Sequence, residues 1–447
     1  MSTELTPEEA GAIARQAFIY GFPMVENYGL MYAQAVTGTD GFNHMASSAR
    51  LYGPEDTDVV TPNNDTPYSM AWLDLGGGPV ELSAGPISPR DRYWSFQVID
   101  FFTNNIAYVG SRATGPADSS QTFLFTGPGW QGTPASEVKE TIPCPSRLIF
   151  LIGRTQLFGA DDIPNVEAIQ DGYRLTAPAV PASAFIPYDK DLIMTLEFFS
   201  YMNQCFVFQL PPASDADLMT EFAKINVGPG LTFDPNAFSA EVRDAMLQAM
   251  LDAKKEIVEA AEGIGLLVEG WSMPQVDQEY FGTTLEDYLF RAAIGYKGIY
   301  ANSPIEALYP IANLDVNGKL LTGAGQQAYT IRFEGGALPP VQFFWSLTMY
   351  YAESKLLVAN SIDRYSISNR TEGVVVGADG SLEFYVQYAQ PEGEAVKNWL
   401  PAPDEAFYVV LRLYGPEGAA LEGEYGEYKV PPFRPSEPPV RARPAVF

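Results

Sequence analysis

The residues best suited to chemistry in this sequence are carboxylates, amides and tyrosines that gather in short polar stretches. One of them, TPNNDTPYS from Thr61 to Ser69, precedes an apolar run that ends at Trp72. Pro62 and Pro67 stiffen it, and the amide and carboxylate groups between them can bond to their own backbone. We interpret the stretch as an ordered loop at a sandwich end or domain junction, where binding residues often lie on a rigid scaffold.

Three further polar stretches lie beside expected strands, at residues 100–112, 363–370 and 398–399. Their side chains can bind sugar hydroxyls or a carboxylate, and Asp, Tyr or Arg can serve acid–base chemistry when they are desolvated. The same residue types also serve structure, in Asx turns, loop anchors and Arg–Asp pairs at a sheet edge. Both interpretations stay open for each stretch taken alone.

A candidate site can be assembled from these four stretches. Asp65 or Asp100 is our candidate base, Tyr68 the candidate acid, and an arginine of the third stretch the candidate anion clamp. Such a site requires the groups to converge on one enclosed pocket. The candidates are Asp65, Tyr68 and Asp100 for catalysis, and Asn63, Asn64, Asn104, Arg364, Asn369, Arg370 and Trp399 for substrate binding.

The sequence lacks the residues that several other kinds of catalytic or metal-binding site require. His44 is the single histidine and the two cysteines are far apart, so we expect no zinc or iron site and no Ser-His-Asp triad. No G-x-S-x-G elbow, phosphate-binding loop or dinucleotide fingerprint is present. A calcium site of oxygen ligands stays conceivable in so acidic a chain, although no EF-hand loop supports one. The sequence therefore predicts no metal and no cofactor.

The composition bears on the class of partner. The 447 residues include 55 acidic and 27 basic side chains, which gives a formal net charge of −28. Such a charge repels phosphate backbones and anionic membrane surfaces. The hydrophobic and aromatic shares, 46% and 13%, are those of a well-packed globular protein. We expect a soluble protein that takes a small-molecule ligand, without nucleic acid and without a membrane span.

The N-terminus and the cysteines bear on the compartment. MSTELTPEEAG has neither the basic region nor the apolar core of a signal peptide. The chain as given therefore suits the cytoplasm, or secretion if a leader was removed. Cys144 and Cys205 do not make a disulfide framework, and we expect two buried thiols.

The elements that must position these residues change in kind along the chain. A helical segment is expected at residues 1–50, and short alternating runs between turn residues predict a β-sandwich at 51–185. A helical module is expected at 186–300, and β-patterning returns at 301–430 before a Pro-rich tail at 431–447. The predicted fold class is α+β, mainly β.

Two helices have clear signals at their ends. The first carries a T-x-x-E capping box from Thr6 to Glu9, and we expect it to stop at Gly21–Pro23. The second is expected between Ser239, a plausible cap, and Gly263, a plausible stop.

Several long motifs resemble a paired bacterial family of unknown function. VVTPNNDTPYSMAWLDL, DRYWSFQVIDFFTNNIAYVGSRATG, FTGPGWQG and LIGRTQL are similar to its N-terminal member. FFWSLTMYYAESKLLVANSIDRYSISNRT, ADGSLEFYVQ, NWLPAP and LRLYGPE are similar to its C-terminal member. The resemblance implies an immunoglobulin-like sandwich, a helical module and a jelly-roll-like sandwich. It also implies a homo-oligomer, a dimer or tetramer, but no particular activity.

The chain departs from this pattern at two places. Relatives usually have a histidine where Tyr388 stands, and they often read N-P-I-N-R-Y where this chain has residues 360–365. A function that depended on that histidine would be lost or altered here.

The sequence supports two hypotheses of different classes. The first is a cofactor-independent hydrolase, lyase or isomerase that acts on a small organic or sugar-like substrate with Asp and Tyr as acid–base groups. The alternative is a non-catalytic oligomeric binding or assembly protein, in which the same groups would be paired off inside the sheets.

Overall fold

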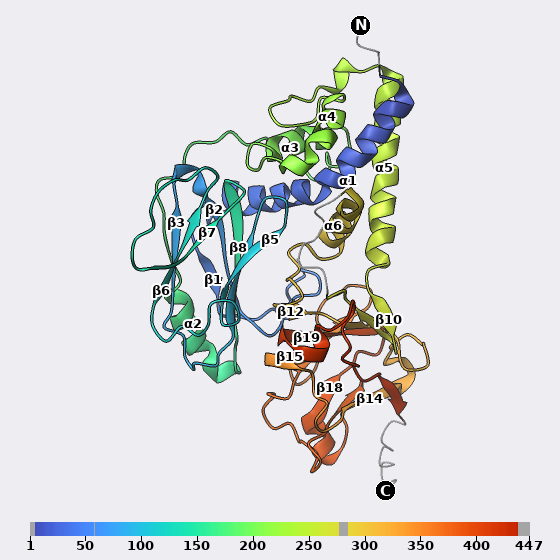
Figure 1. Cartoon of the computed structure of the whole chain (residues 1–447). Helices are drawn as coiled ribbons and strands as arrows, with labels where there is room; N and C mark the ends of the chain where they lie inside the picture. The colour runs from blue at the N-terminus through green and yellow to red at the C-terminus, as the bar shows by residue number, and fades with distance from the viewer. Residues whose placement is uncertain (1–4, 58, 277–284, 437–447) are drawn as a thin grey trace.

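The computed structural model describes residues 5–57, 59–276 and 285–436, and it has three parts (Figure 1). A helical module lies beside one end of an N-terminal β-sandwich, and a C-terminal β-sandwich lies below both. The α+β fold class predicted from the sequence is confirmed. The end of the Pro-rich tail, residues 437–447, lies outside the described residues.

The helical module forms around two long helices that pack side by side and run in the same direction, α1 (Pro7–Met31) and α5 (Ala240–Glu262). Thr6 and Glu9 form the capping box predicted for α1, and Ser239 caps α5 through the backbone N–H of Val242. Apolar side chains of both helices are buried in one core. The remaining helices of the module are α3 (Phe198–Cys205), α4 (Ala216–Ala223) and α6 (Leu285–Gly298).

The predicted end of the first helix at Gly21–Pro23 is wrong. The helix continues through Pro23 to Met31 and into a π-helical turn, Tyr32–Val36. Its residues after the proline are almost all buried, so tertiary packing outweighs the lost backbone hydrogen bond. In Figure 1 the helix bends, so that its first half runs along α5 and its second half reaches the N-terminal sandwich.

The N-terminal sandwich has a sheet of five strands, in the order β1-β2-β8-β4-β5, packed against a sheet of four, in the order β7-β6-β3-β9. Alternating side chains of the two sheets fill its core. The outer face of the five-stranded sheet packs against the helical module at Trp72 and Phe150, which stack 4.5 Å apart. The elements are β1 (Ala46–Ser48), β2 (Tyr68–Asp74), β3 (Val80–Ala84), β4 (Trp94–Ile99), β5 (Asn105–Gly110), β6 (Gln121–Thr126), β7 (Val138–Pro143), β8 (Leu148–Thr155), α2 (Ile163–Asp171) and β9 (Arg174–Thr176).

The C-terminal sandwich has a larger sheet in the order β10-β11-β13-β19-β15-β16, with β12 also paired to β19, and a smaller sheet in the order β18-β17-β14-β20. The two long strands β15 and β19 pair antiparallel, and their inner face supplies much of the core. The strands are β10 (Leu266–Val268), β11 (Trp271–Met273), β12 (Ala307–Leu308), β13 (Ile311–Ala312), β14 (Ala328–Phe333), β15 (Val341–Tyr351), β16 (Ser366–Ile367), β17 (Leu382–Gln387), β18 (Trp399–Pro401), β19 (Phe407–Pro416) and β20 (Arg434–Ser436).

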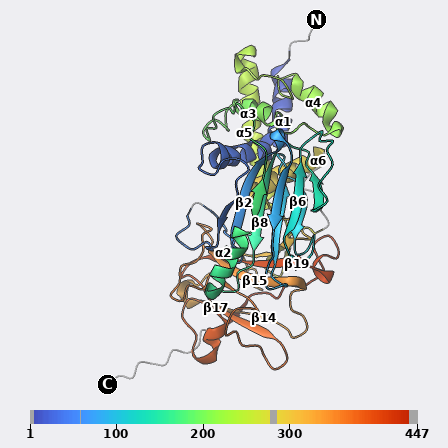
Figure 2. The same cartoon turned by 90° about the vertical axis from the view of Figure 1, so that its left-hand side faces the viewer.

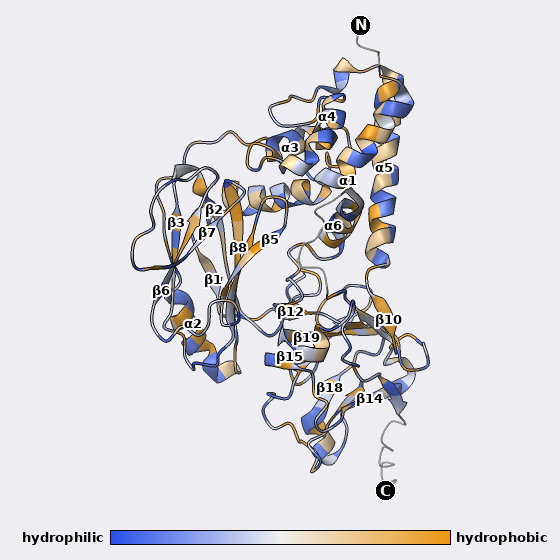
Figure 3. Cartoon of the chain, in the orientation of Figure 1, coloured by the Kyte–Doolittle hydropathy of each residue, from blue (hydrophilic) through white to orange (hydrophobic). Residues whose placement is uncertain are grey.

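The outer face of β15 and β19 is turned toward the N-terminal sandwich, which stands above it in Figure 2. Side chains alternate along a strand, so the residues on this face are two apart. They form the cross-strand pairs Phe344–Tyr414, Ser346–Arg412 and Tyr350–Tyr408. Figure 3 shows that residues of intermediate and polar hydropathy interrupt the apolar ones in these strands. Polar groups are therefore buried where the two sandwiches meet.

Candidate active site between the two sandwiches

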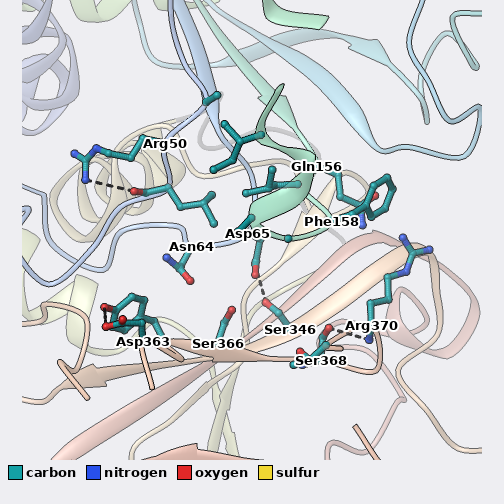
Figure 4. A pocket seen from close by; sticks show the side chains of 18 of the residues that line it. Arg50, Asn64, Asp65, Gln156, Phe158, Ser346, Asp363, Ser366, Ser368 and Arg370 are labelled. Carbon is teal, nitrogen blue, oxygen red and sulfur yellow. Dashed lines mark hydrogen bonds between the residues drawn. The ribbon is translucent and has the colours of Figure 1, made fainter. Parts of the chain in front are cut away.

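A pocket of about 1030 Å³ lies between the two sandwiches. The N-terminal sandwich contributes residues 47–51, 64–65 and 156–160, together with α2. The C-terminal sandwich contributes Phe344, Ser346 and much of the segment 362–372. Figure 4 shows side chains from both sandwiches around one space. Since the walls come from two domains, the pocket exists only when the domains are docked.

The loop quoted at the outset, TPNNDTPYS, forms part of this junction. The backbone N–H of Thr61 donates to the Lys355 carbonyl, and the Tyr350 hydroxyl donates to the Pro62 carbonyl at 2.5 Å. The Asn63 amide oxygen accepts from the backbone N–H of Asp65 at 2.7 Å, an Asx turn that fixes the loop. The loop is thus ordered and docked onto β15 and β19.

Asp65 is the carboxylate at the inner wall of the pocket. Its Oδ2 accepts hydrogen bonds from the Ser346 hydroxyl at 2.7 Å and from the Tyr414 hydroxyl at 3.0 Å. Figure 4 shows it reaching from the N-terminal sandwich toward Ser346 on β15. No donor among the described residues reaches Oδ1, the other carboxylate oxygen. Asp65 is therefore oriented through one oxygen, and the described residues donate no hydrogen bond to the second.

Burial raises the pKa of Asp65, although the Arg412 guanidinium and the hydrogen bonds from Ser346 and Tyr414 oppose the rise. A carboxyl group with a raised pKa holds its proton closer to neutral pH than an exposed aspartate does. Such a group can give or take a proton during a reaction.

Aromatic side chains line two sides of the pocket. Phe344 is stacked on Tyr414 with ring centroids 4.1 Å apart, which fixes the ring beside Asp65. Phe158 is 43% exposed and lies between two guanidinium groups, with Arg92 4.4 Å and Arg370 6.0 Å from its centroid. An exposed ring held in this way offers a flat apolar face to a ligand.

Four of the candidate residues come together at this pocket: Asn64, Asp65, Arg364 and Arg370. Arg370 donates to the Phe343 carbonyl through Nη2 and is otherwise exposed. Arg364 donates to three carbonyls, of which the one of Trp399 is 2.9 Å away, so its Nη1 is engaged in structure. Asn64 donates to the Tyr52 carbonyl at 2.7 Å. Arg370 is thus the more available cation.

Tyr68 and Asn63 lie next to the pocket but do not line it. Tyr68 begins β2, directly opposite Arg154 on β8, and the Arg154 guanidinium lies 5.5 Å from the centre of its ring. Asn63 donates to the Tyr414 hydroxyl at 2.9 Å and so supports the tyrosine that bonds to Asp65.

Asp100 and Asn104 lie away from the pocket, where the five-stranded sheet meets the helical module. Asp100 accepts from the backbone N–H groups of Phe102 and Asn104, and from the side chains of Asn104 and Gln209. These donors occupy both carboxylate oxygens in a loop that follows β4. The arrangement is that of a loop anchor.

The last two candidates, Trp399 and Asn369, do not line the pocket. Trp399 is buried in the C-terminal sandwich, and its indole N–H donates to the Gln387 carbonyl at 2.8 Å. Asn369 is exposed, between two pocket residues of the segment 366–372.

The sequence analysis missed the residues that hold Asp65. Ser346 and Tyr414 lie in long apolar strands, and the sequence around them has the pattern of an ordinary strand. Their signal was the period of two: Ser346, Thr348 and Tyr350 recur on one face of β15, opposite Arg412 and Tyr414 on β19. A row of polar groups on one face of a buried strand indicates a polar interface.

The described residues contain neither a cluster of metal ligands nor a membrane-spanning helix. In residues 5–57, 59–276 and 285–436, no group of three or more His, Cys, Asp or Glu side chains is placed to hold a metal ion. In the same part of the chain, no helix combines the length and apolar character needed to cross a bilayer.

The pattern of the sequence matches two family models in chain order. Residues 42–177 match a family described as protein of unknown function (DUF1254), and residues 306–418 match a second described as protein of unknown function (DUF1214). Together the two models match more than half of the 447 residues. The chain belongs to these paired families. The resemblance stated from the sequence motifs is thereby confirmed.

One solved structure similar to this DUF1254–DUF1214 chain supports the fold. The crystal structure of the VPA0106 protein from Vibrio parahaemolyticus is 25% identical in sequence, with a TM-score of 0.74 over 96% of this chain and 100% of that one. An uncharacterized protein from Burkholderia cenocepacia is 11% identical, with a TM-score of 0.45 over 96% and 94% of the two chains. No curated protein matches the DUF1254–DUF1214 chain.

Proposed function

We propose that this protein is an enzyme that acts on a small organic or sugar-like molecule bound between the two sandwiches. Asp65 is the general acid or base. The reaction class is hydrolysis, elimination or isomerisation, each of which can proceed by proton transfer at a positioned carboxyl group without a redox cofactor.

The observation that carries the proposal is the state of Asp65. A buried carboxylate is costly unless all its oxygens are bonded. Ser346 and Tyr414 bond only to Oδ2, while Asp65 also lines the pocket. A purely structural aspartate, such as Asp100, has donors on both oxygens. Asp65 is thus arranged to meet a ligand.

The rest of the pocket suits a polar substrate. Serines, amides and carboxylates dominate its wall, and they can exchange hydrogen bonds with hydroxyl groups. Phe158 and Phe344 supply ring faces against which the apolar side of a sugar or a small ring can pack. Arg370 supplies a positive charge at the C-terminal side.

The hydrogen bonds around Asp65 support the roles that we propose for its neighbours. Ser346 and Tyr414 orient the carboxyl group and stabilise its ionised form, which opposes the effect of burial on its pKa. Burial also raises the pKa of Tyr414, so its hydroxyl remains a donor at neutral pH. The substrate meets Oδ1, to which it gives a proton or from which it takes one.

The proposal is tested with chromogenic substrates. The full chain is incubated with a panel of 4-nitrophenyl glycosides and 4-nitrophenyl esters, and release of nitrophenolate is followed. We expect turnover of at least one compound, with a loss of about 100-fold or more in Asp65→Asn, the usual cost of removing a general acid or base.

The matched control is Asp100→Asn, a second buried aspartate, which lies away from the pocket. It is expected to change stability and to leave kcat/KM of the folded protein near the wild-type value. Turnover that is unaffected by Asp65→Asn would contradict the proposal. Binding of these compounds without turnover would favour the alternative, a non-catalytic binding protein.

A further inference from the structure

Two buried arginines at the domain junction form no close ion pair with a described residue, although Arg412 is near enough to Asp65 to lower its pKa. Arg154 on β8 and Arg412 on β19 are 6% and 4% exposed. Among the residues that the structure describes, neither guanidinium has a carboxylate oxygen within 4 Å. Arginine stays protonated in proteins, so both are buried cations.

Other arginines in the described part of the chain show what is missing. Arg92 is paired with Asp162, Arg147 with Asp74, and Arg112 with Glu306. Burying a guanidinium without an ion pair is unfavourable, as it is for any isolated buried charge. Arg154 and Arg412 are therefore exceptions that call for a reason.

The two arginines differ in their contacts. Arg412 donates to the Thr348 hydroxyl at 2.8 Å and to the Tyr350 hydroxyl at 2.7 Å, and it also reaches the Thr61 and Pro62 carbonyls at 3.4 Å. Arg154 donates to the Gln97 side chain at 2.9 Å, but its Nε has no partner in the described structure. Leaving a buried donor unpaired is unfavourable, which indicates that an acceptor is missing at Arg154.

Both arginines face the junction from opposite sides. Arg154 is in register with Tyr68 and Ser95 on the outer face of the five-stranded sheet. Arg412 is in register with Ser346 on the face of β15 and β19 that is turned toward it. Tyr309 lies near both arginines. Burial raises the pKa of Tyr309, and the charge of each guanidinium opposes this rise.

This cluster lies next to the inner wall of the pocket, although neither arginine lines it. Ser346 lines the pocket and is the cross-strand neighbour of Arg412, with Cβ atoms about 5 Å apart in such pairs. Asp65 also lines the pocket and accepts from Tyr414, which belongs to the same strand as Arg412. Asp65 and Ser346 therefore separate the pocket from the two arginines.

We propose that Arg154 and Arg412 bind a carboxylate group of the substrate next to the inner wall of the pocket. The inference rests on the proposed function and narrows its substrate to an organic acid, such as a sugar acid. The carboxylate accepts from Arg154 Nε and from Arg412, and the substrate atoms next to it then lie beside Oδ1 of Asp65.

The charges favour a carboxylate over a phosphate. With Asp65 ionised, the two arginines leave one uncompensated positive charge, which a single carboxylate neutralises. A phosphate group, with a charge near −2 at neutral pH, leaves an excess of negative charge in the same buried place. The planar guanidinium fork also matches the two oxygens of a carboxylate.

The site is tested with bromide, an anion small enough for any such site. Crystals of the full chain are soaked with sodium bromide, and an anomalous difference map locates the ions. We expect a peak in contact with both Arg154 and Arg412. We also expect sodium acetate to displace it and sodium phosphate at equal ionic strength to leave it.

Variants measure the contribution of Arg154 in solution by calorimetric titration with sodium acetate. Arg154→Lys keeps the charge but loses the fork, and acetate is expected to bind about tenfold more weakly. Arg90→Gln, an exposed arginine outside the junction, is the control and is expected to bind acetate like the wild type. Equal affinity in Arg154→Lys and wild type would overturn the assignment.

The bromide map is decisive without any variant. Absence of a peak between the two arginines in the wild-type crystal overturns the proposal, and displacement by phosphate but not by acetate overturns the substrate class. The outcome is separate from that of the proposed function. Bromide at this site with no dependence of turnover on Asp65 would refute the enzyme mechanism alone, and turnover of neutral substrates without anion binding would refute this inference alone.

Discussion

At the scale of the residue, Asp65 combines two features that oppose each other. It is buried, which raises its pKa, and it is bonded through Oδ2 to Ser346 and Tyr414, which lowers it. Burial is the larger effect. The protein thus maintains a carboxyl group whose ionisation costs stability, as expected of a residue retained for function.

The first prediction concerns the pH dependence of stability. Because folding raises the pKa of Asp65 above its ordinary value of 3.8, this residue contributes most stability when protonated, and the contribution is lost as pH rises through the folded pKa. We expect Asp65→Asn, which carries no charge, to gain about 0.5–2 kcal/mol relative to wild type at about pH 8, and less at about pH 4. Urea denaturation at the two pH values measures it. A gain that is larger at low pH would contradict the direction assigned to the pKa.

The second prediction concerns Ser346. Its hydroxyl stabilises the ionised form of Asp65, so Ser346→Ala is expected to raise the pKa of Asp65 further and to cost about 1–2 kcal/mol in stability. An NMR titration of the aspartate side-chain carboxyl carbons follows the pKa. Ser366→Ala is the control, since Ser366 lines the same pocket without a hydrogen bond to Asp65. Equal titration curves in wild type and Ser346→Ala would argue against this role.

At the scale of the element, local signals predicted the starts of helices better than their ends. The capping residues Thr6 and Ser239 act as their sequence pattern indicates, because a cap is made within one turn of the chain. Gly21 and Pro23 indicated a stop, yet α1 continues past both. Gly21 serves packing instead, since a Cβ there would lie 2.6 Å from Met202 Sδ. Such a contact joins residues far apart in sequence, and no local pattern reveals it.

The third prediction tests this role of Gly21. Helix propensity alone favours Ala over Gly by about 1 kcal/mol. In Gly21→Ala the new methyl group meets the buried side chains of Met202 and Phe198, and we expect a net loss of about 1–3 kcal/mol. Gly298→Ala is the control, because it is also helical and no atom lies within 4 Å of the added Cβ. The transition temperatures of the two variants are compared by thermal unfolding. A stabilised Gly21→Ala would contradict the prediction, because it would show that the Met202 side chain moves aside without a cost in free energy.

At the scale of the whole molecule, the pocket depends on how the two sandwiches dock. Polar contacts hold the junction: the Tyr93 hydroxyl donates to Glu306 at 2.7 Å, Arg112 forms an ion pair with Glu306, and the TPNNDTPYS loop bonds to β15 and β19. The sequence predicted the two sandwiches and placed Asp65 in a loop at a junction. It could not predict that Asp65, Arg364 and Arg370 share one pocket while Asp100 lies elsewhere, because that outcome depends on the docking of separate domains.

The fourth prediction concerns this junction. Glu306 is 1% exposed and accepts from both Tyr93 and Arg112, so Glu306→Gln leaves the half-buried Arg112 without its charged partner. We expect a loss of about 3 kcal/mol in stability. Calorimetry is expected to show a lower transition temperature, and proteolysis faster cleavage between the sandwiches. The matched control, Glu334→Gln, breaks an exposed ion pair with Arg332 and is expected to cost no more than about 1 kcal/mol.

The central claim is that ligands bind between the sandwiches at Asp65, and crystallographic fragment screening tests it most directly. Crystals of the full chain are soaked with a set of small polyols, sugar acids and neutral sugars. We predict that bound fragments gather in the pocket, with an atom in hydrogen-bond contact with Oδ1 of Asp65. Fragments that bind elsewhere while this pocket stays vacant throughout the set would contradict the account.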